Sequence, residues 1–159
     1  MYPNKPLLAD LKIVDAGSKI GGMLLDGRPD FTTILCACEP GTITSVQAEA
    51  KKRGLNTKLQ IDLYGHWSFE DVKLWKELGI SQLTLQHSGD KPGGWDEEEI
   101  ATLKKLCDMG IDVAATGSIG YDDLEKFRGI PVSCFIFGRA IRKAADPAKE
   151  ARRIDRKSV

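Results

Sequence analysis

The sequence lacks a long apolar run and an excess of either charge, and each absence excludes a class of protein. No apolar stretch approaches the roughly 20 residues that span a bilayer, and the segment MYPNKPLLAD has no apolar signal-peptide core. Lysine and arginine together number 23, as do aspartate and glutamate, so the chain has no broad basic surface for nucleic acid. We therefore expect a cytoplasmic protein, without a membrane or nucleic-acid partner, that acts on a small molecule.

Cysteine is also scarce. The four cysteines form neither the CxxC pairs of a zinc site nor the dense pattern of a disulfide scaffold. They stand in apolar stretches that predict strands or helices, so we expect buried thiols at Cys36, Cys38, Cys107 and Cys134.

Short apolar runs alternate with segments of helical spacing along the whole chain. The runs begin near residues 7, 31, 59, 83, 112 and 134, with the sequences PLLADL, FTTILC, LQIDL, LTLQ, VAAT and CFIFG. A repeat of about 26 residues matches a strand followed by a crossover helix. Because no linker interrupts the alternation and 42% of the residues are hydrophobic, we expect one α/β domain over residues 1–159.

Parallel strands joined in this way form an open doubly wound sheet or a closed (β/α)8 TIM barrel. A barrel needs about 250 residues, or somewhat fewer when compact. We expect an incomplete TIM barrel of six β/α units, with the missing two, about 50 residues at this repeat, placed before Met1. Uncovered strand edges would then favour association with another chain.

The expected helices carry start and stop signals. Ser68 with Asp71 forms a capping box, and Pro40 suits a first helical turn. Glycines stand where helices should end, at Gly54, Gly79 and Gly110. The last stretch, DPAKEARRIDRKSV, predicts a closing helix with a basic tail.

The segment ADLKIVDAG gathers three charges near the end of the first expected strand. Strand geometry puts Asp10 and Lys12 on the same side, and Asp15 follows on the loop. Two carboxylates and an ammonium so close together can hold a hard cation and stabilise an enolate oxygen. A surface cluster of salt bridges is the alternative that these residues alone leave open.

Two further polar residues end apolar strands. Asp62 stands near the end of LQIDL, where an unpaired buried carboxylate would be costly, so it is expected to face the site; a strand-end cap is the alternative. His87 ends LTLQH before the flexible segment SGDKPGGW and could relay a proton, although a packing role is common for a lone histidine.

Small residues follow the last two strands. Thr116, Gly117 and Ser118 come after one of them, and Gly138 with Arg139 comes after the next. Turns of this kind at the end of a barrel commonly bind phosphate through backbone N–H groups, and the arginine adds a forked donor. The alternative is a pair of ordinary turns. The tryptophans are interpreted as packing residues, at Trp67, Trp75 and Trp95.

Taken in order, ADLKIVDAG, LQIDLYGHWSFEDVKLW, the strand-ending His87, KKLCDMGIDVAATGS and GIPVSCFIFGRAIRKAADP resemble the 3-keto-L-gulonate 6-phosphate decarboxylase family. That family belongs to the orotidine monophosphate decarboxylase suprafamily, which also contains hexulose 6-phosphate synthase. The resemblance implies a carbon-carbon lyase that converts a sugar-phosphate β-keto acid to L-xylulose 5-phosphate and CO2 through an enediolate, in ascorbate or pentose catabolism.

The resemblance also implies residue roles. Asp10 would bind Mg2+, Lys12 would stabilise the enediolate with Asp62 in the same site, and Asp15 would reach into a partner subunit's site, which implies a homodimer with shared active sites. His87 would assist protonation of the intermediate by water. The substrate and its phosphate would be held by Thr116, Gly117, Gly138 and Arg139.

Three departures from the family pattern keep other functions open. The acidic residues of the family's first two strands have no counterpart, Asp62 replaces the usual glutamate as in the synthases, and SGDKPGGW lacks an arginine linked to decarboxylase activity. An aldol reaction of the hexulose 6-phosphate synthase type is therefore one alternative. A noncatalytic, truncated barrel that binds phosphate or a partner chain is the other.

Overall fold

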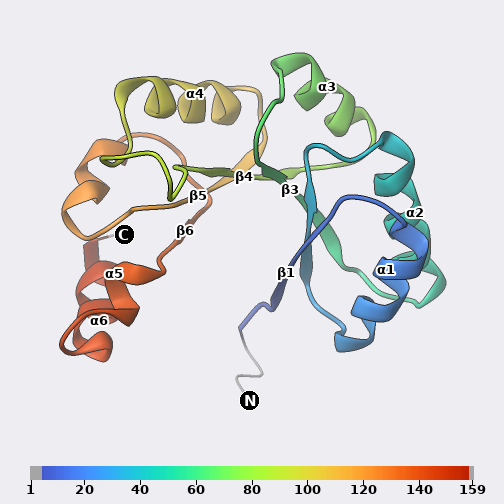
Figure 1. The fold of residues 1–159 in the computed structure, drawn as a ribbon, viewed down its shortest axis with the longest axis horizontal. Helices are drawn as coiled ribbons and strands as arrows, with labels where there is room; N and C mark the ends of the chain where they lie inside the picture. The colour runs from blue at the N-terminus through green and yellow to red at the C-terminus, as the bar shows by residue number, and fades with distance from the viewer. Residues whose placement is uncertain (1–4, 158–159) are drawn as a thin grey trace. The chain divides into compact units, whose positions relative to one another are not determined.

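Strands and helices alternate along the chain, as the sequence predicts (Figure 1). The structure is a computed structural model that describes residues 5–157. Each of the six expected strands is confirmed, and each begins within one residue of the expected position. The elements are, in order, β1 (Leu8–Ile13), α1 (Gly17–Leu24), η1 (Leu25–Gly27), β2 (Phe31–Leu35), α2 (Pro40–Lys52), β3 (Lys58–Leu63), α3 (Phe69–Glu77), β4 (Gln82–Gln86), α4 (Glu97–Asp108), β5 (Asp112–Thr116), η2 (Asp122–Phe127), β6 (Cys134–Ile136), α5 (Arg139–Arg142) and α6 (Pro147–Lys157).

The strands follow one another in one sheet in the order β1-β2-β3-β4-β5-β6. The pairs β1/β2, β2/β3 and β5/β6 are parallel. Strands β2 and β3 keep an unbroken register, from Phe31 opposite Lys58 to Leu35 opposite Asp62. Parallel neighbours need a long crossover connection, and the intervening helical segments provide it. This topology is that of consecutive β/α units.

The density of internal contacts divides the chain into two units, with the boundary between Leu83 and Thr84. The first unit contains β1 to β3 with α1 to α3, and the second contains β5 and β6 with α4 to α6. The boundary falls inside β4, so each unit takes part of that strand. A division by contacts does not measure how the chain unfolds, and the single domain over residues 1–159 stays a prediction.

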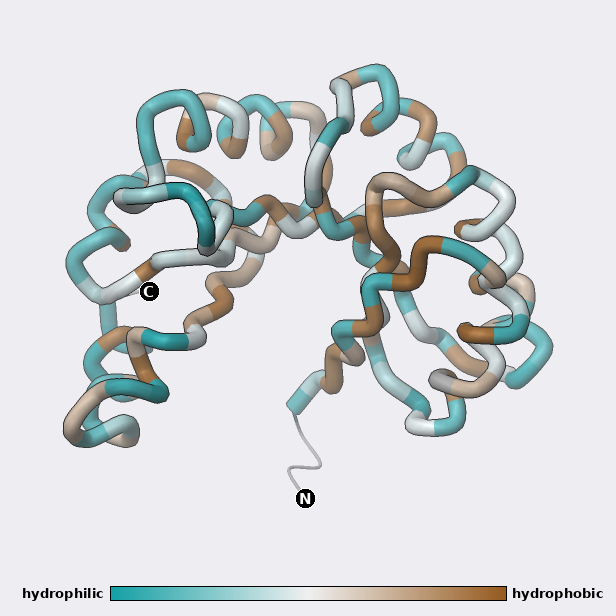
Figure 2. The backbone as a smooth tube through the Cα atoms, viewed as in Figure 1, coloured by the Kyte–Doolittle hydropathy of each residue, from teal (hydrophilic) through white to brown (hydrophobic). Residues whose placement is uncertain are grey.

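The core of the first unit lies between its strands and its helices. Ile34 and Ile61 in the strands, Ile43 and Val46 in α2, and Val72 in α3 have no exposed surface. Burying one such side chain contributes roughly 1.5–3 kcal/mol relative to leaving it in water. Figure 2 shows hydrophobic residues along the strands and mixed hydropathy along the helices. Burial of one helix face against the strands therefore stabilises this unit.

The core of the second unit has the same character. Leu103 and Leu106 lie one turn apart on α4 and are fully buried, as are Val113 and Ala115 in β5. The tube in Figure 2 alternates between hydrophilic and hydrophobic residues along α4. Residues three apart share one face of a helix, so this spacing directs an apolar stripe inward.

The predicted helix signals are confirmed. Pro40 is the first residue of α2, and Ser68 and Asp71 form both bonds of a capping box at α3. The three stop glycines lie just beyond α2, α3 and α4, with φ angles of 65° at Gly54, 82° at Gly79 and 71° at Gly110. No helix between residues 5 and 157 is long and apolar enough to cross a membrane.

One crossover differs from the sequence expectation. A 3-10 helix, η2, stands between β5 and β6 instead of an α-helix. Its start is turned by the N–H of Gly120, which donates to Asp123 Oδ2 at 2.9 Å. Gly129, with a φ of 78°, and Pro131 follow soon after Phe127 and end it. Short helices commonly adopt 3-10 geometry.

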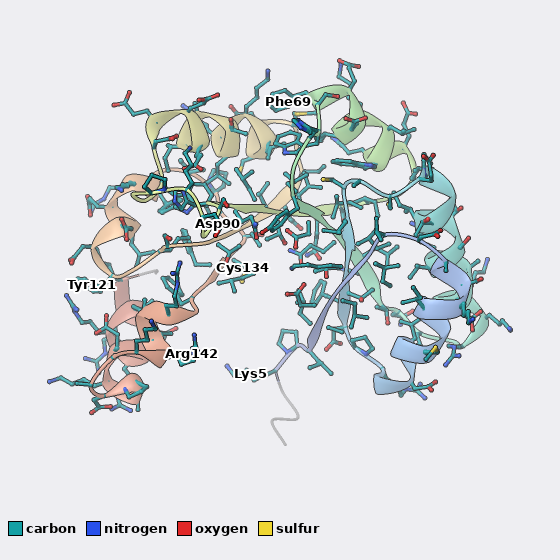
Figure 3. All side chains as sticks on the ribbon, in the orientation of Figure 1. Lys5, Phe69, Asp90, Tyr121, Cys134 and Arg142 are labelled. Atoms are coloured by element: carbon teal, nitrogen blue, oxygen red, sulfur yellow. The ribbon has the colours of Figure 1, made fainter. Side chains whose placement is uncertain are left out.

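The expectation of four buried thiols is confirmed for Cys36 and Cys38 and is wrong for the other two. Cys107 is half-buried, and Cys134 is exposed on β6 (Figure 3). Strand β6 is the last in the sheet order, so no further strand of the described residues lies beside it. The apolar sequence around Cys134 therefore does not ensure burial.

Candidate functional site

Lys12 lies between two carboxylates of the first unit. Its Nζ is 2.8 Å from Asp10 Oδ1 on the same strand and 2.6 Å from Asp62 Oδ2 on β3. The Asp62 side chain is only 3% exposed, whereas those of Asp10 and Lys12 are 56% and 40% exposed. The structure thus brings together three residues singled out from the sequence, two of them 50 positions apart. One end of the ion pair is buried and the other is open to a ligand.

A bulge in β1 aims Lys12 at this cluster. Ala9 stands opposite Thr32 and Ile13 opposite Ile34, so three residues of β1 face the single residue Thr33. Lys12 has a φ of 48°, which is a left-handed conformation that is rare for a side chain with a Cβ. Bulges often redirect side chains at functional sites. Lys12 and Asp10 are therefore placed by an irregular backbone as well as by strand alternation.

Thr33 fills the space that the bulge opens. Its hydroxyl accepts the N–H groups of Leu11 and Lys12, each at 2.9 Å, and donates to Asp10 Oδ1 at 2.9 Å. A hydroxyl has one donor and two acceptor positions, and all are used here. Thr33 therefore replaces the missing ladder bonds and fixes the Asp10 carboxylate at the same time.

The cluster holds its charges firmly. Burial by itself would raise the pKa of Asp10, but hydrogen bonds from Lys12 and Thr33, together with the Lys12 charge, outweigh it and lower that pKa. Burial by itself would lower the pKa of Lys12, but its hydrogen bonds to Asp10 and Asp62 and their charges raise it. Lys12 is thus a fixed cation, suited to a developing oxyanion.

Asp62 retains one oxygen for another partner. Its Oδ1 is buried and accepts no hydrogen bond within the described residues. Leaving a buried acceptor unpaired costs about 1–3 kcal/mol, so a donor or a cation would stabilise it. Across residues 5–157 no group of three or more His, Cys, Asp or Glu side chains could hold a metal alone. Mg2+ usually takes one or two carboxylates and completes its shell with substrate and water, and Asp10 with Asp62 fits that pattern.

Asp15 lies outside this cluster. It follows β1 on the loop before α1, its side chain is exposed, and within residues 5–157 it makes no hydrogen bond or ion pair. Its carboxylate is therefore available to another molecule.

His87, in the second unit, is buried. Its Nδ1 lies 3.0 Å from Glu99 Oε2, and its Nε2 lies 3.1 Å from the carbonyl oxygen of Lys91. Lys91 in turn reaches Asp96 at 2.6 Å and Glu99 at 3.3 Å. These contacts tie the segment after β4 to the start of α4. Both ring nitrogens are engaged, so the imidazole holds the segment in this conformation.

Thr116 and Gly117 form a tight turn beside His87. The Thr116 hydroxyl donates to the carbonyl of Ile136 on β6 at 3.1 Å, and the Thr116 carbonyl accepts the His87 N–H at 3.0 Å. A Cβ on Gly117 would lie only 2.1 Å from the His87 carbonyl oxygen, and the φ of Gly117 is 85°. Glycine is therefore required at this position.

Arg139 faces the same turn from the next β/α unit. Its side chain is exposed, and its Nη2 lies 3.4 Å from the Ser118 hydroxyl. Gly138 precedes α5, has no side chain and leaves the approach open, with nothing within 4 Å of an added Cβ. The second unit therefore places Thr116, Gly117 and Arg139 around one turn, as the sequence predicts, with Gly138 beside Arg139. A guanidinium next to small residues suits an anionic group such as phosphate.

Three residues of these clusters had no site role in the sequence reasoning. They are Thr33 at the bulge, Glu99 on His87, and Trp95, whose Nε1–H donates to the Gly117 carbonyl at 2.8 Å. Glu99 had a detectable signal, because Asp96 and Glu99 have the spacing of a capping box, and the structure contains that box. The local sequence around Thr33 and Trp95 carries no comparable signal.

Comparison with known proteins places these clusters in a family context. The sequence matches the Orotidine 5'-phosphate decarboxylase / HUMPS family over residues 2–154. It is 38% identical over 159 residues to 3-keto-L-gulonate-6-phosphate decarboxylase UlaD of Escherichia coli O139:H28, and the match covers 98% of this chain and 73% of that protein.

Solved structures agree. KGPDC from Streptococcus mutans, solved as a complex with a sugar phosphate, superposes with a TM-score of 0.92 at 31% identity, over 99% of this chain and 74% of that one. The 3-hexulose-6-phosphate synthase of Salmonella typhimurium gives a TM-score of 0.76 at 28% identity, over 99% and 74%. The fold is accordingly that of an incomplete TIM barrel, and the named decarboxylases support a carboxy-lyase by resemblance. The chain belongs to the Orotidine 5'-phosphate decarboxylase / HUMPS family.

Proposed function

We propose that the chain is a Mg2+-dependent lyase that converts 3-keto-L-gulonate 6-phosphate to L-xylulose 5-phosphate and CO2. The observation that carries the proposal is the Lys12 ammonium held between Asp10 and Asp62, at 2.8 and 2.6 Å. The 38% identity to UlaD supports the choice of substrate, and the sugar-phosphate complex of KGPDC supports a ligand of that class.

In the proposed reaction the bond between the carboxylate carbon and the α-carbon breaks. Its electron pair moves toward the β-carbonyl and gives an enediolate, and the α-carbon then takes a proton. Lys12 stabilises the new oxyanion, because its neighbours keep it charged and Asp62 holds its Nζ in place. A Mg2+ ion at Asp10 would neutralise further charge on the substrate oxygens.

The second unit supplies the other roles. Thr116, Gly117, Gly138 and Arg139 bind the substrate and its phosphate, through backbone N–H groups and the Arg139 guanidinium. His87 assists protonation through a water molecule. Because Nε2 now contacts the Lys91 carbonyl, that water must replace the carbonyl before a proton passes through the ring.

The test is CO2 release from 3-keto-L-gulonate 6-phosphate in the presence of Mg2+. Lys12→Ala removes the oxyanion partner, and loss of such a group typically costs about 10²–10³ in kcat. Lys51→Ala is the matched control, because Lys51 is exposed in the last turn of α2, away from the cluster. Equal rates for Lys12→Ala and the parent chain, or no release by the parent, would refute the proposed function.

An aldol reaction of the hexulose 6-phosphate synthase kind is the second candidate. Asp62 favours it, since the synthases resemble this chain in carrying the shorter acid there, and a synthase shares 28% identity. The same enediolate would attack formaldehyde instead of taking a proton. Consumption of both ribulose 5-phosphate and formaldehyde would identify a synthase. A chain that binds phosphate but catalyses neither reaction is the noncatalytic alternative.

We also propose that the active form is a homodimer in which Asp15 completes the site of the partner. The exposed, unpaired Asp15 carboxylate supports this role. Mixing inactive Asp15→Ala and Lys12→Ala chains should restore activity, because mixed dimers regain one intact site of two, or about a quarter of full activity after random exchange. Restored activity requires a shared site, and its absence would exclude one.

A further inference from the structure

We propose that Trp95 is a positioning residue that orients the Gly117–Ser118 peptide toward the phosphate of the ligand. This inference rests on the proposed function only in naming a phosphate as that ligand. Trp95 precedes α4, its side chain is 3% exposed, and its Nε1–H donates to the Gly117 carbonyl at 2.8 Å. A buried indole that donates to a turn fixes the orientation of one peptide group.

The orientation of that peptide determines where its N–H points. In a trans peptide the carbonyl of one residue and the N–H of the next point in opposite directions. Because the Gly117 carbonyl points to Trp95, the Ser118 N–H points away from the indole. This N–H meets no acceptor within residues 5–157, and Arg139 Nη2 lies 3.4 Å from the hydroxyl of the same serine. An unpaired backbone donor beside a guanidinium is suited to an anion.

The turn is held on both sides. Against one side stands the backbone of His87, which leaves no room for a Cβ on Gly117. On the other side the Trp95 indole holds the Gly117 carbonyl. Gly117 and Ser118 both have positive φ angles, 85° and 51°, and the second is unfavourable for a residue with a Cβ. The hydrogen bond from Trp95 offsets part of that cost, so its loss should let the peptide rotate.

The indole is itself fixed by packing. Its ring meets Phe127 edge to face at 5.1 Å between centroids, and Phe127 meets Phe135 on β6 in the same way at 5.1 Å. A phenylalanine at position 95 would keep an aromatic ring in this row and lose only the N–H donor. Trp95→Phe therefore separates positioning from packing.

The experiment measures affinity for inorganic phosphate by calorimetry, for the full chain and two variants. Trp95→Phe should weaken binding about five- to tenfold, the effect of losing one net hydrogen bond. Trp75→Phe is the matched control, because Trp75 is 4% exposed in α3 and lies in the first unit. Its phosphate affinity should equal that of the parent chain. If Trp95→Phe binds as tightly as Trp75→Phe, the inference is overturned.

A second measurement keeps the inference testable if Trp95→Phe fails to fold. Adding phosphate to the parent chain should shift the Ser118 amide proton downfield in an NMR titration, and an unchanged Ser118 resonance would overturn the inference. The CO2 assay decides separately on the proposed function. Phosphate binding that depends on Trp95, in a chain that releases no CO2, would support the inference and refute the decarboxylase.

Discussion

Gly117 and Gly129 share a left-handed backbone but differ in their surroundings. Their φ angles are 85° and 78°, yet a Cβ on Gly117 would strike the His87 carbonyl oxygen, while one on Gly129 meets nothing within 4 Å. We predict that Gly129→Ala costs about 1–2 kcal/mol, the price of the backbone conformation. Gly117→Ala should cost clearly more and abolish phosphate binding. Urea unfolding curves compare the two, and equal losses would contradict the close contact.

The cysteines should differ in reactivity, because only the thiolate reacts and only accessible sulfur is reached. Burial, with the neighbouring Cys36, raises the pKa of Cys38 to about 11, so at pH 8 this buried thiol is almost fully protonated. We predict that iodoacetamide at pH 8 labels the exposed Cys134 well before Cys36 or Cys38. Mass spectrometry of timed samples measures the order. Unfolding in guanidinium, as a control, should make all four react.

At the scale of elements, the capping box of α3 offers a direct test of how local sequence stabilises a helix. The Ser68 hydroxyl accepts the N–H of Asp71, and the Asp71 carboxylate accepts the N–H of Ser68. Ser68→Ala should lower the free energy of unfolding by about 1 kcal/mol. Ser81→Ala, at an exposed serine outside helices and strands, should change it by less than about 0.5 kcal/mol. Thermal unfolding of both variants provides the comparison.

The elements also show why the sequence predicts some features and misses others. Ser68, Pro40 and the stop glycines act through bonds within a few residues, so their effect is readable locally. The β1 bulge is different, because it depends on Thr33 of a neighbouring strand accepting two N–H groups from β1. The aspartates and lysine of the cluster were predicted correctly, but the backbone that aims them was not.

The second unit gives the same lesson. His87 was singled out from its place at a strand end, yet its fixed contacts with Glu99 and the Lys91 carbonyl come from the start of the following helix and the loop before it. Trp95 was assigned to packing, and the ring does pack, but its N–H serves the Gly117 turn. A single sequence shows which residues are polar or aromatic, and it does not show which distant backbone group they meet.

At the scale of the whole molecule, the two units share a strand. The boundary at Leu83 and Thr84 falls inside β4, so neither unit contains that strand complete. We predict that the chain unfolds in one cooperative transition, as expected for one domain. Tryptophan fluorescence and far-ultraviolet circular dichroism should give coincident urea curves. Separate midpoints would show that the units unfold independently and that the single-domain prediction is wrong.

The left-handed backbone at Lys12 also limits which amino acids an engineer could place there. Strand propensity alone ranks valine above asparagine, but a φ of 48° penalises β-branched side chains and tolerates asparagine. Both substitutions remove the ammonium, so catalysis is lost in either case. We predict that Lys12→Asn melts at a higher temperature than Lys12→Val, a ranking opposite to that of an ordinary strand position, and calorimetric scanning of the two proteins decides it. A library built on the assumption of a regular strand would discard the best-folded variants at the position closest to the chemistry.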